Sequence, residues 1–264
     1  MLVVISPAKR LDFDKVQAKI PPSDPAFQKD AISLSTTARR LSVAKLQKLM
    51  AISPDLAKLT QGRFRAFDPD PVADVIKPAI LAFAGDTYQG LEAASLDAAE
   101  LAYAQEHLRI LSGLYGLLRP MDQIQPYRLE MGSRLVTRRG KTLYQYWGDR
   151  LTAEVNQTLS QTGDKALINC ASVEYFTALP TVKLTTPVIT PVFLEDTANG
   201  PKIISFFAKK ARGAMARFIL QNRLTDPGAL LEFDTGGYRY QPALSEDLKP
   251  AFLRPSANDT APES

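Results

Sequence analysis

The sequence predicts a mixed α/β (α+β) fold, in which helices surround a mixed sheet within a single compact domain. Short apolar runs that end at proline, glycine or polar residues are typical of buried strands, and they occur at residues 2–6, 79–83, 166–170, 188–194 and 203–207. Segments with helical periodicity lie between these runs. A chain of 264 residues can bury a large core. We expect one domain over residues 1–253 and a disordered tail over residues 254–264.

The helical segments follow from apolar spacing and capping residues. Residues 30–50 are expected to form one helix, and Ser53-Pro54 predicts an N-cap with proline at the next helix's first position. Further helices are expected over residues 95–106, over residues 148–159 and from Ala208 onward. Residues 108–111 fit a helix or a strand, and the glycines after them favour a strand. Pro191 places the run 188–194 at a sheet edge or a bulge.

Composition excludes several classes of protein. No apolar run is long enough to cross a membrane and the N-terminus does not resemble a signal peptide, so we expect a cytoplasmic protein without membrane partners. Cys170 and His107 are the only cysteine and histidine, which excludes internal disulfides and Cys/His zinc sites. We expect a buried, unreactive thiol at Cys170 and a helix-end role for His107. No cofactor and no metal are expected, although composition does not exclude a metal site made only of carboxylates.

Positive charge is concentrated in the body of the chain. Residues 1–224 hold 29 basic and 21 acidic residues, whereas residues 225–264 hold 3 basic and 7 acidic ones. Within residues 197–225 there are six cations and no acid. Such a run can steer anions toward one face, although a solvated helix surface would have the same composition.

The helix expected from Ala208 carries most of these cations. Its apolar arc leaves Lys209, Lys210, Arg212 and Arg217 on the remaining surface, with small residues between them. Small residues let a phosphate backbone approach closely, and the lysines lie near the helix N-terminus, which favours anions. We therefore predict a phosphate-binding helix. The alternative is an ordinary surface helix.

The segment from Leu108 to Gly132 combines glycines with arginines. Gly113 and Gly116 resemble the hairpin of a helix-hairpin-helix module, whose backbone N–H groups bind DNA phosphates, although their spacing is one residue wider than usual. A structural tight turn is the alternative. DNA binding without sequence preference depends on neutralising phosphates, so we also expect the arginines of this segment to contact DNA phosphates. They are Arg109, Arg119 and Arg128.

Polar residues also follow the expected strands, where α/β proteins often bind ligands. Together they could line one cleft of an enzyme, although each one alone is more often a cap, a turn residue or an ion-pair partner. The candidate cleft groups are Asp86, Tyr88, Glu130, Asn169, Ser172, Glu174 and Tyr175, beside the cations Lys9, Arg128 and Lys209.

Six segments in this order and spacing resemble the YaaA peroxide-stress family: residues 5–9, 85–91, 108–132, 144–149, 169–176 and 204–224. The resemblance runs from Met1 to about Tyr238. It implies a bacterial cytosolic protein of the oxidative stress response, with a mixed α/β fold particular to the family, a positively charged cleft and a helix-hairpin-helix element. It also implies DNA binding, protection of DNA and limitation of damage by iron and peroxide. It supplies no catalytic residues.

Two functions therefore compete, and a third is weaker. The first is binding of double-stranded or structured DNA with little sequence preference, through phosphate contacts at Lys9, Arg109, Gly113, Gly116, Arg119, Arg128, Lys209, Lys210, Arg212 and Arg217. The second is an enzyme that acts on a nucleotide, a nucleobase or a DNA lesion in the same cleft. The third is iron binding by carboxylates. The sequence favours the first and assigns no catalytic residue.

Overall fold

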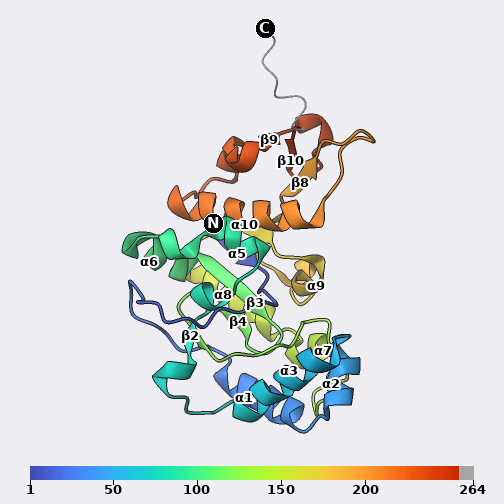
Figure 1. Cartoon of the computed structure of the whole chain (residues 1–264). Coiled ribbons are helices and arrows are strands. Elements are labelled where there is room, and N and C mark those ends of the chain that lie inside the picture. Colours follow the sequence, from blue (N-terminus) through green and yellow to red (C-terminus); the bar gives the residue numbers. More distant parts are fainter. Residues whose placement is uncertain (256–264) are drawn as a thin grey trace.

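The central element is a five-stranded sheet in the order β4-β3-β1-β6-β7. β1 is its middle strand and runs parallel to β3 and β6, β6 runs parallel to β7, and β4 is antiparallel to β3. The structure, a computed structural model shown in Figure 1, describes residues 1–255. The strands are β1 Leu2–Ile5, β3 Leu108–Ser112, β4 Gly116–Leu118, β6 Leu167–Cys170 and β7 Val188–Ile189. Every residue of β1 is buried, as expected for an apolar strand covered on both faces.

Two smaller sheets complete the strand set. A three-stranded sheet has the order β8-β10-β9, and β2 pairs with β5. Helix α10, Ser205–Gln221, contacts both the central sheet and β8, and in Figure 1 it lies between the central sheet and the C-terminal sheet. The strands are β2 Lys77–Pro78, β5 Gln123–Ile124, β8 Val192–Glu195, β9 Arg239–Tyr240 and β10 Ala251–Arg254.

Several helices begin at capping residues. Ser53 caps α3 by accepting from the Leu56 N–H, and Asp97 forms a capping box with Glu100 at the start of α6. The α-helices before α10 are α1 Gln28–Arg39, α2 Val43–Met50, α3 Pro54–Ala66, α4 Ala79–Ala82, α5 Asp86–Leu91, α6 Ala98–His107, α7 Leu143–Trp147, α8 Arg150–Thr162 and α9 Val173–Phe176. Short 3-10 turns lie at Ala73–Val75, Ala93–Ser95, Thr181–Lys183, Pro227–Glu232, Thr235–Gly237 and Pro242–Leu244.

The predicted mixed α/β class is confirmed, and four segments differ from their predicted form. Residues 79–82 form helix α4 rather than a strand, because a short buried apolar run has the same signature in either state. Residues 203–207 lead into α10 instead of forming a strand. Residues 30–50 form two helices, since the Ser42 side chain caps the second one. The run 188–194 divides at Pro191 into β7 and β8, which belong to different sheets.

The helix-hairpin-helix element is not confirmed at its expected position. Strands β3 and β4 flank the turn, which makes this segment a β-hairpin. A Cβ on Gly113 would lie 2.2 Å from the Leu129 carbonyl oxygen, and one on Gly116, whose φ is +71°, would lie 2.8 Å from the Trp147 ring. Both glycines are buried. Close packing and a left-handed turn account for glycine here.

The predicted tail falls mostly outside the described part of the chain. Residues 256–264 lie outside the described residues, and so does the expectation that they are disordered. Arg254 ends β10, and its guanidinium donates a 2.7 Å hydrogen bond to Glu195. The first residue of the predicted tail therefore lies in a strand.

Candidate functional site

A charged pocket of about 360 Å³ lies at the carboxyl edge of the central sheet. Four segments line it: residues 6–10 after β1, residues 84–87 at the start of α5, residues 170–175 after β6, and two side chains of α10. Since β1 and β6 are adjacent and parallel, the residues that follow them meet at the same edge. This is the usual place for ligands in α/β sheets.

Hydrogen bonds at the floor of the pocket join the segments that follow β1 and β6. The Ser172 backbone N–H donates to Ser6 Oγ at 2.9 Å, and the Ser6 hydroxyl donates to Ser172 Oγ at 3.3 Å. The Tyr88 hydroxyl donates to the Ser6 carbonyl oxygen at 3.2 Å, and burial raises the pKa of Tyr88 well above its ordinary value. Tyr88 therefore supports the floor from α5 and stays neutral.

The cationic wall belongs to α10, which crosses α5 at two glycines. A Cβ on Gly213 would lie 1.8 Å from the Thr87 carbonyl oxygen, and one on Gly90 would lie 2.0 Å from the Lys210 carbonyl oxygen. This close crossing brings Lys209 to the pocket opposite the start of α5, with its Nζ 3.9 Å from Asp86 Oδ2. Glycine at both positions thus permits the close approach of α5 and α10.

Arg212 is the most informative group of this wall. It is half-buried, lines the pocket, and makes no hydrogen bond or ion pair with another side chain or carbonyl of residues 1–255. Burial lowers the pKa of its guanidinium, against a smaller opposing effect of the Cys170 thiol. A desolvated cation without an acidic partner is costly, and a bound anion would compensate it.

Glu174 brings an acidic group to the lining from the segment that follows β6. Glu174 Oε1 accepts from the Gly132 N–H at 3.0 Å, and the Tyr144 hydroxyl donates to the Glu174 carbonyl oxygen at 2.7 Å. A small neighbouring gap is lined by Arg128 and Glu130, whose side chains pair at 3.0 Å. The gap and the pocket share Pro7, Ala8, Lys9 and Tyr175 among their lining residues. The two spaces are therefore adjacent.

The structure brings most of the predicted cleft groups together. The predicted residues that line the pocket are Lys9, Asp86, Ser172, Glu174, Tyr175, Lys209 and Arg212. Arg128 and Glu130 line the adjacent gap, and Tyr88 supports the floor. Asn169 is buried instead, where its Oδ1 accepts from the Ala171 N–H at 3.0 Å and fixes the turn after β6. Lys210 is exposed on α10 outside the lining.

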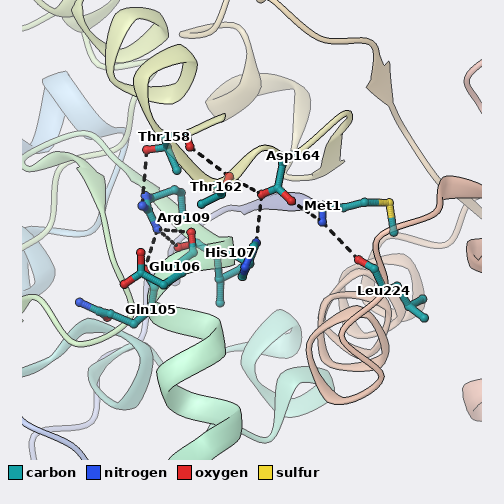
Figure 2. Close-up of polar contacts among 10 residues, drawn as sticks. Met1, Gln105, Glu106, His107, Arg109, Thr158, Thr162, Asp164 and Leu224 are labelled. Carbon is teal, nitrogen blue, oxygen red and sulfur yellow. Dashed lines mark hydrogen bonds and ion pairs between the residues drawn. The ribbon is translucent and has the colours of Figure 1, made fainter. Parts of the chain in front are cut away.

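The other predicted phosphate contacts have structural partners. Arg109 is 7% exposed and donates to the carbonyl oxygens of Gln105, Glu106 and Leu108, at the junction of α6 and β3 (Figure 2). Arg119 pairs with Asp122, whereas Arg217 donates to the carbonyl oxygens of Leu91 and Glu92. Arg109 and Arg119 both lie at the end of the hairpin where β3 begins and β4 ends, away from the carboxyl edge that holds the pocket.

Sequence reasoning missed Ser6 and Arg10, which line the pocket directly after β1. The rule that selected Ser172, a polar residue just past a buried strand, applies equally to Ser6 and could have found it. Cys170 also lines the pocket, but burial raises the pKa of its thiol to about 12. The thiol is therefore protonated and unreactive at neutral pH.

A second polar cluster lies at the amino edge of the same sheet (Figure 2). Asp164 pairs with the Met1 amino group at 2.7 Å and with His107 Nδ1 at 3.0 Å. Thr162 donates to the same carboxylate at 2.8 Å. Burial alone would raise the pKa of Asp164, but the hydrogen bonds from His107, the amino group and Thr162 outweigh it and hold the pKa well below its ordinary value. This cluster anchors the start of β1.

Two features are absent from residues 1–255. No group of three or more His, Cys, Asp or Glu side chains is arranged to hold a metal ion, so nothing in that range favours iron binding by carboxylates. Within the same range, the helices fall short of the length and apolar character needed to span a bilayer.

These features define a mixed α/β protein with a charged pocket at the carboxyl edge of its central sheet. The family model described as peroxide stress protein YaaA matches residues 1–244, and the chain belongs to this family, which supports a role in oxidative stress. The chain is 62% identical to a UPF0246 protein of Ruegeria pomeroyi, over 97% of this chain and 99% of that one. UPF0246 proteins of Roseobacter denitrificans and Jannaschia sp. are 62% and 59% identical, with at least 97% of each chain covered.

Proposed function

We propose that this peroxide-stress protein binds DNA with little sequence preference at the basic face around the pocket and thereby protects DNA from damage. The observation that carries the proposal is Arg212, a half-buried guanidinium without an acidic partner in residues 1–255 that lines the pocket beside Lys209. Lys210 lies exposed on the same helix, and Lys9 is 68% exposed across the pocket. Cations so placed neutralise phosphates without reading bases.

The proposal reduces the set of predicted contacts. Lys9, Lys209 and Arg212 remain candidates because they line the pocket, and Lys210 remains one because it is exposed on the same helix. The proposed contacts exclude the groups that are buried or occupied by other partners, which are Gly113, Gly116, Arg109, Arg119, Arg128 and Arg217.

The test is duplex affinity measured across a series of salt concentrations. We expect the double variant Lys209→Glu/Lys210→Glu to weaken binding by about 10- to 100-fold, and Arg212→Gln to weaken it by about tenfold, with the salt slope falling by about 1 for each lost contact. The effect should be uniform across DNA sequences, because phosphate contacts carry no sequence information.

Lys48→Glu is the matched control, because Lys48 is an exposed lysine on α2, far from α10 in Figure 1. Its affinity should stay within about twofold of the parent protein, since screening limits the effect of distant charges. Unchanged affinity in the α10 variants, or an equal loss in Lys48→Glu, would contradict the assignment of α10 as the binding surface.

A second candidate function is an enzyme that acts on a nucleotide, a nucleobase or a DNA lesion. It is favoured by the convergence of Lys9, Asp86, Glu174 and Tyr175 on one pocket, which puts acids, a phenol and a lysine within one small-molecule volume. Incubation with nucleotides and with lesion-containing duplexes, followed by mass spectrometry, tests it. A product that disappears in Glu174→Gln supports the enzyme, and unaltered substrates under conditions of saturated binding contradict it.

A further inference from the structure

The amino group of Met1 forms a buried ion pair at the amino edge of the central sheet (Figure 2). Its nitrogen lies 2.7 Å from Asp164 Oδ1 and donates to the Leu224 carbonyl oxygen at 3.2 Å. Met1 is 1% exposed, and the Asp164 side chain is 5% exposed. An ammonium has three N–H donors, so one group serves both acceptors. The pair is shielded from water, unlike most chain ends.

The surroundings favour a cation because three helices end beside the amino group. α6 ends at His107, α8 ends at Thr162 just before Asp164, and α10 ends at Gln221 just before Leu224. The C-terminus of a helix carries a partial negative charge, which adds to that of the carboxylate. An ammonium is therefore stabilised here more than a neutral amide would be.

The Leu224 acceptor is held by a strained turn. Arg223 has a left-handed φ of +47°, and the Leu224 N–H donates to the Ile219 carbonyl oxygen at 3.1 Å. These features are those of a Schellman motif at the end of α10, in which glycine usually takes the left-handed position. Such strain persists only where surrounding contacts compensate it, and the hydrogen bond from Met1 is one of these contacts.

A formyl group on this amine would remove its charge and most of its donors. A formamide is neutral and keeps a single N–H, so it could serve Asp164 or Leu224 but not both. Asp164 would keep only His107 and Thr162, and a buried carboxylate that loses its cation is strongly destabilising. The formyl carbon and oxygen would also need space in a closely packed region.

We propose that Met1 is a deformylation site and that the fold requires its processing, with the methionine itself retained. Bacterial chains begin with a formylated methionine, and the relatives named above come from bacteria. Retention follows from the Met1 side chain, which belongs to the hydrophobic core. The substrate of the hydrolase is thus the formylated Met1 of the unfolded chain. The requirement is independent of DNA binding.

The reaction is a hydrolysis with water as its only co-reactant. The C–N bond of the formamide breaks, and the hydroxyl of water joins the formyl carbon. The amine nitrogen takes the remaining proton of water and then the proton of the formic acid. The products are formate and the ammonium that pairs with Asp164.

The test compares the full chain with a free amine and the full chain with a formylated Met1. Both are made in a cell-free extract, the second with the deformylase inhibited, and the intact mass identifies each form. We expect the formylated chain to unfold roughly 5 to 15 °C lower in a thermal scan, or to stay unfolded. Hydrolysis of its formyl group in denaturant, followed by refolding, should restore the midpoint of a free-amine sample treated in the same way.

Lys58→Gln is the control for the loss of one positive charge, because Lys58 is an exposed lysine within α3. Its midpoint should stay within about 2 °C of that of the parent protein. Asp164→Asn tests the partner of the amine. In this variant the formyl group should lower the midpoint by about half, or less, of the shift in the parent protein, because the ion pair is already absent.

Chemical acetylation of the native free-amine protein gives a reading that needs no variant. Chain-end amines react faster than lysines in unfolded chains, because they are less basic. In the folded protein we expect the order to be reversed, with the Met1 amine labelled at least about tenfold more slowly than Lys58, because opening must precede its reaction. Mass spectrometry of the peptides measures both rates.

Three results would overturn the proposal. The first is a formylated chain with the same unfolding midpoint as the free-amine form. The second is an equal formyl effect in Asp164→Asn and in the parent protein, which would remove the ion pair as the cause. The third is labelling of Met1 in the folded protein as fast as that of Lys58.

Discussion

Replacement of Gly213 by alanine is expected to lower the free energy of unfolding by about 1 to 3 kcal/mol or more. The added Cβ would lie 1.8 Å from the Thr87 carbonyl oxygen and 2.9 Å from the Leu91 nitrogen, so α5 and α10 must move apart. Backbone atoms cannot yield as the end of a flexible side chain can. Urea denaturation followed by circular dichroism measures the change.

Gly62→Ala is the matched control, because Gly62 also lies within a helix, and a Cβ there would meet no atom of another element within 4 Å. Alanine at this position should stabilise the protein by about 0.5 to 1 kcal/mol, through helix propensity alone. The two substitutions are chemically identical and are expected to have opposite signs. If Gly213→Ala is as stable as the parent protein, the tight crossing of α5 and α10 is contradicted.

The second large effect concerns Asp164 at the amino edge of the sheet. Asp164→Asn removes the anion that faces the buried Met1 amino group and His107, and we expect a loss of about 3 to 5 kcal/mol. Asp149→Asn is the control, because Asp149 pairs with Lys183 but both side chains are at least half exposed. That pair should contribute about 0 to 1 kcal/mol. Equal losses in the two variants would contradict the importance of burial.

The same carboxylate gives a defined pH dependence. Its pKa in the folded protein lies below its ordinary value, so the unfolded chain binds a proton at Asp164 more readily than the folded one. The stabilisation is therefore complete above about pH 4 and decreases as the pH falls from there toward the folded-state pKa. Asp164→Asn should show a shallower loss of stability below about pH 4 than the parent protein. Parallel stability curves for the two proteins would contradict this assignment.

Local sequence patterns predicted those helix starts and strands whose formation depends on residues close in the sequence. The Ser53 cap follows from hydrogen bonds within one turn, and the strand at residues 166–170 follows from a short apolar run. The position of Ser172 and Lys9 was also predictable, because polar residues after buried strands collect at one edge once those strands are adjacent and parallel. That β1 lies between β3 and β6 could not be read from the sequence.

The errors come from partners that are remote in the sequence. A Cβ on Gly113 would meet Leu129 and one on Gly116 would meet Trp147, so the need for glycine depends on packing between positions 16 and 31 residues apart. The guanidinium of Arg109 donates to carbonyl oxygens at the end of α6, a role that the sequence of its own segment did not indicate. Arg212 shows the converse, because only the fold reveals that this cation lacks an acidic partner in residues 1–255.

The central position of β1 has a consequence for synthesis on the ribosome. Val3 pairs with Leu108 on one side and with Ile168 on the other, so the first strand to be made has no partner until more than a hundred residues have followed it. At about 5 to 20 residues per second, that wait is on the order of 5 to 20 s for the first partner. The Arg212 side of the pocket is translated later still. We expect nascent chains to expose an unpaired apolar strand throughout this interval, and therefore to depend on chaperones most strongly when translation is slow.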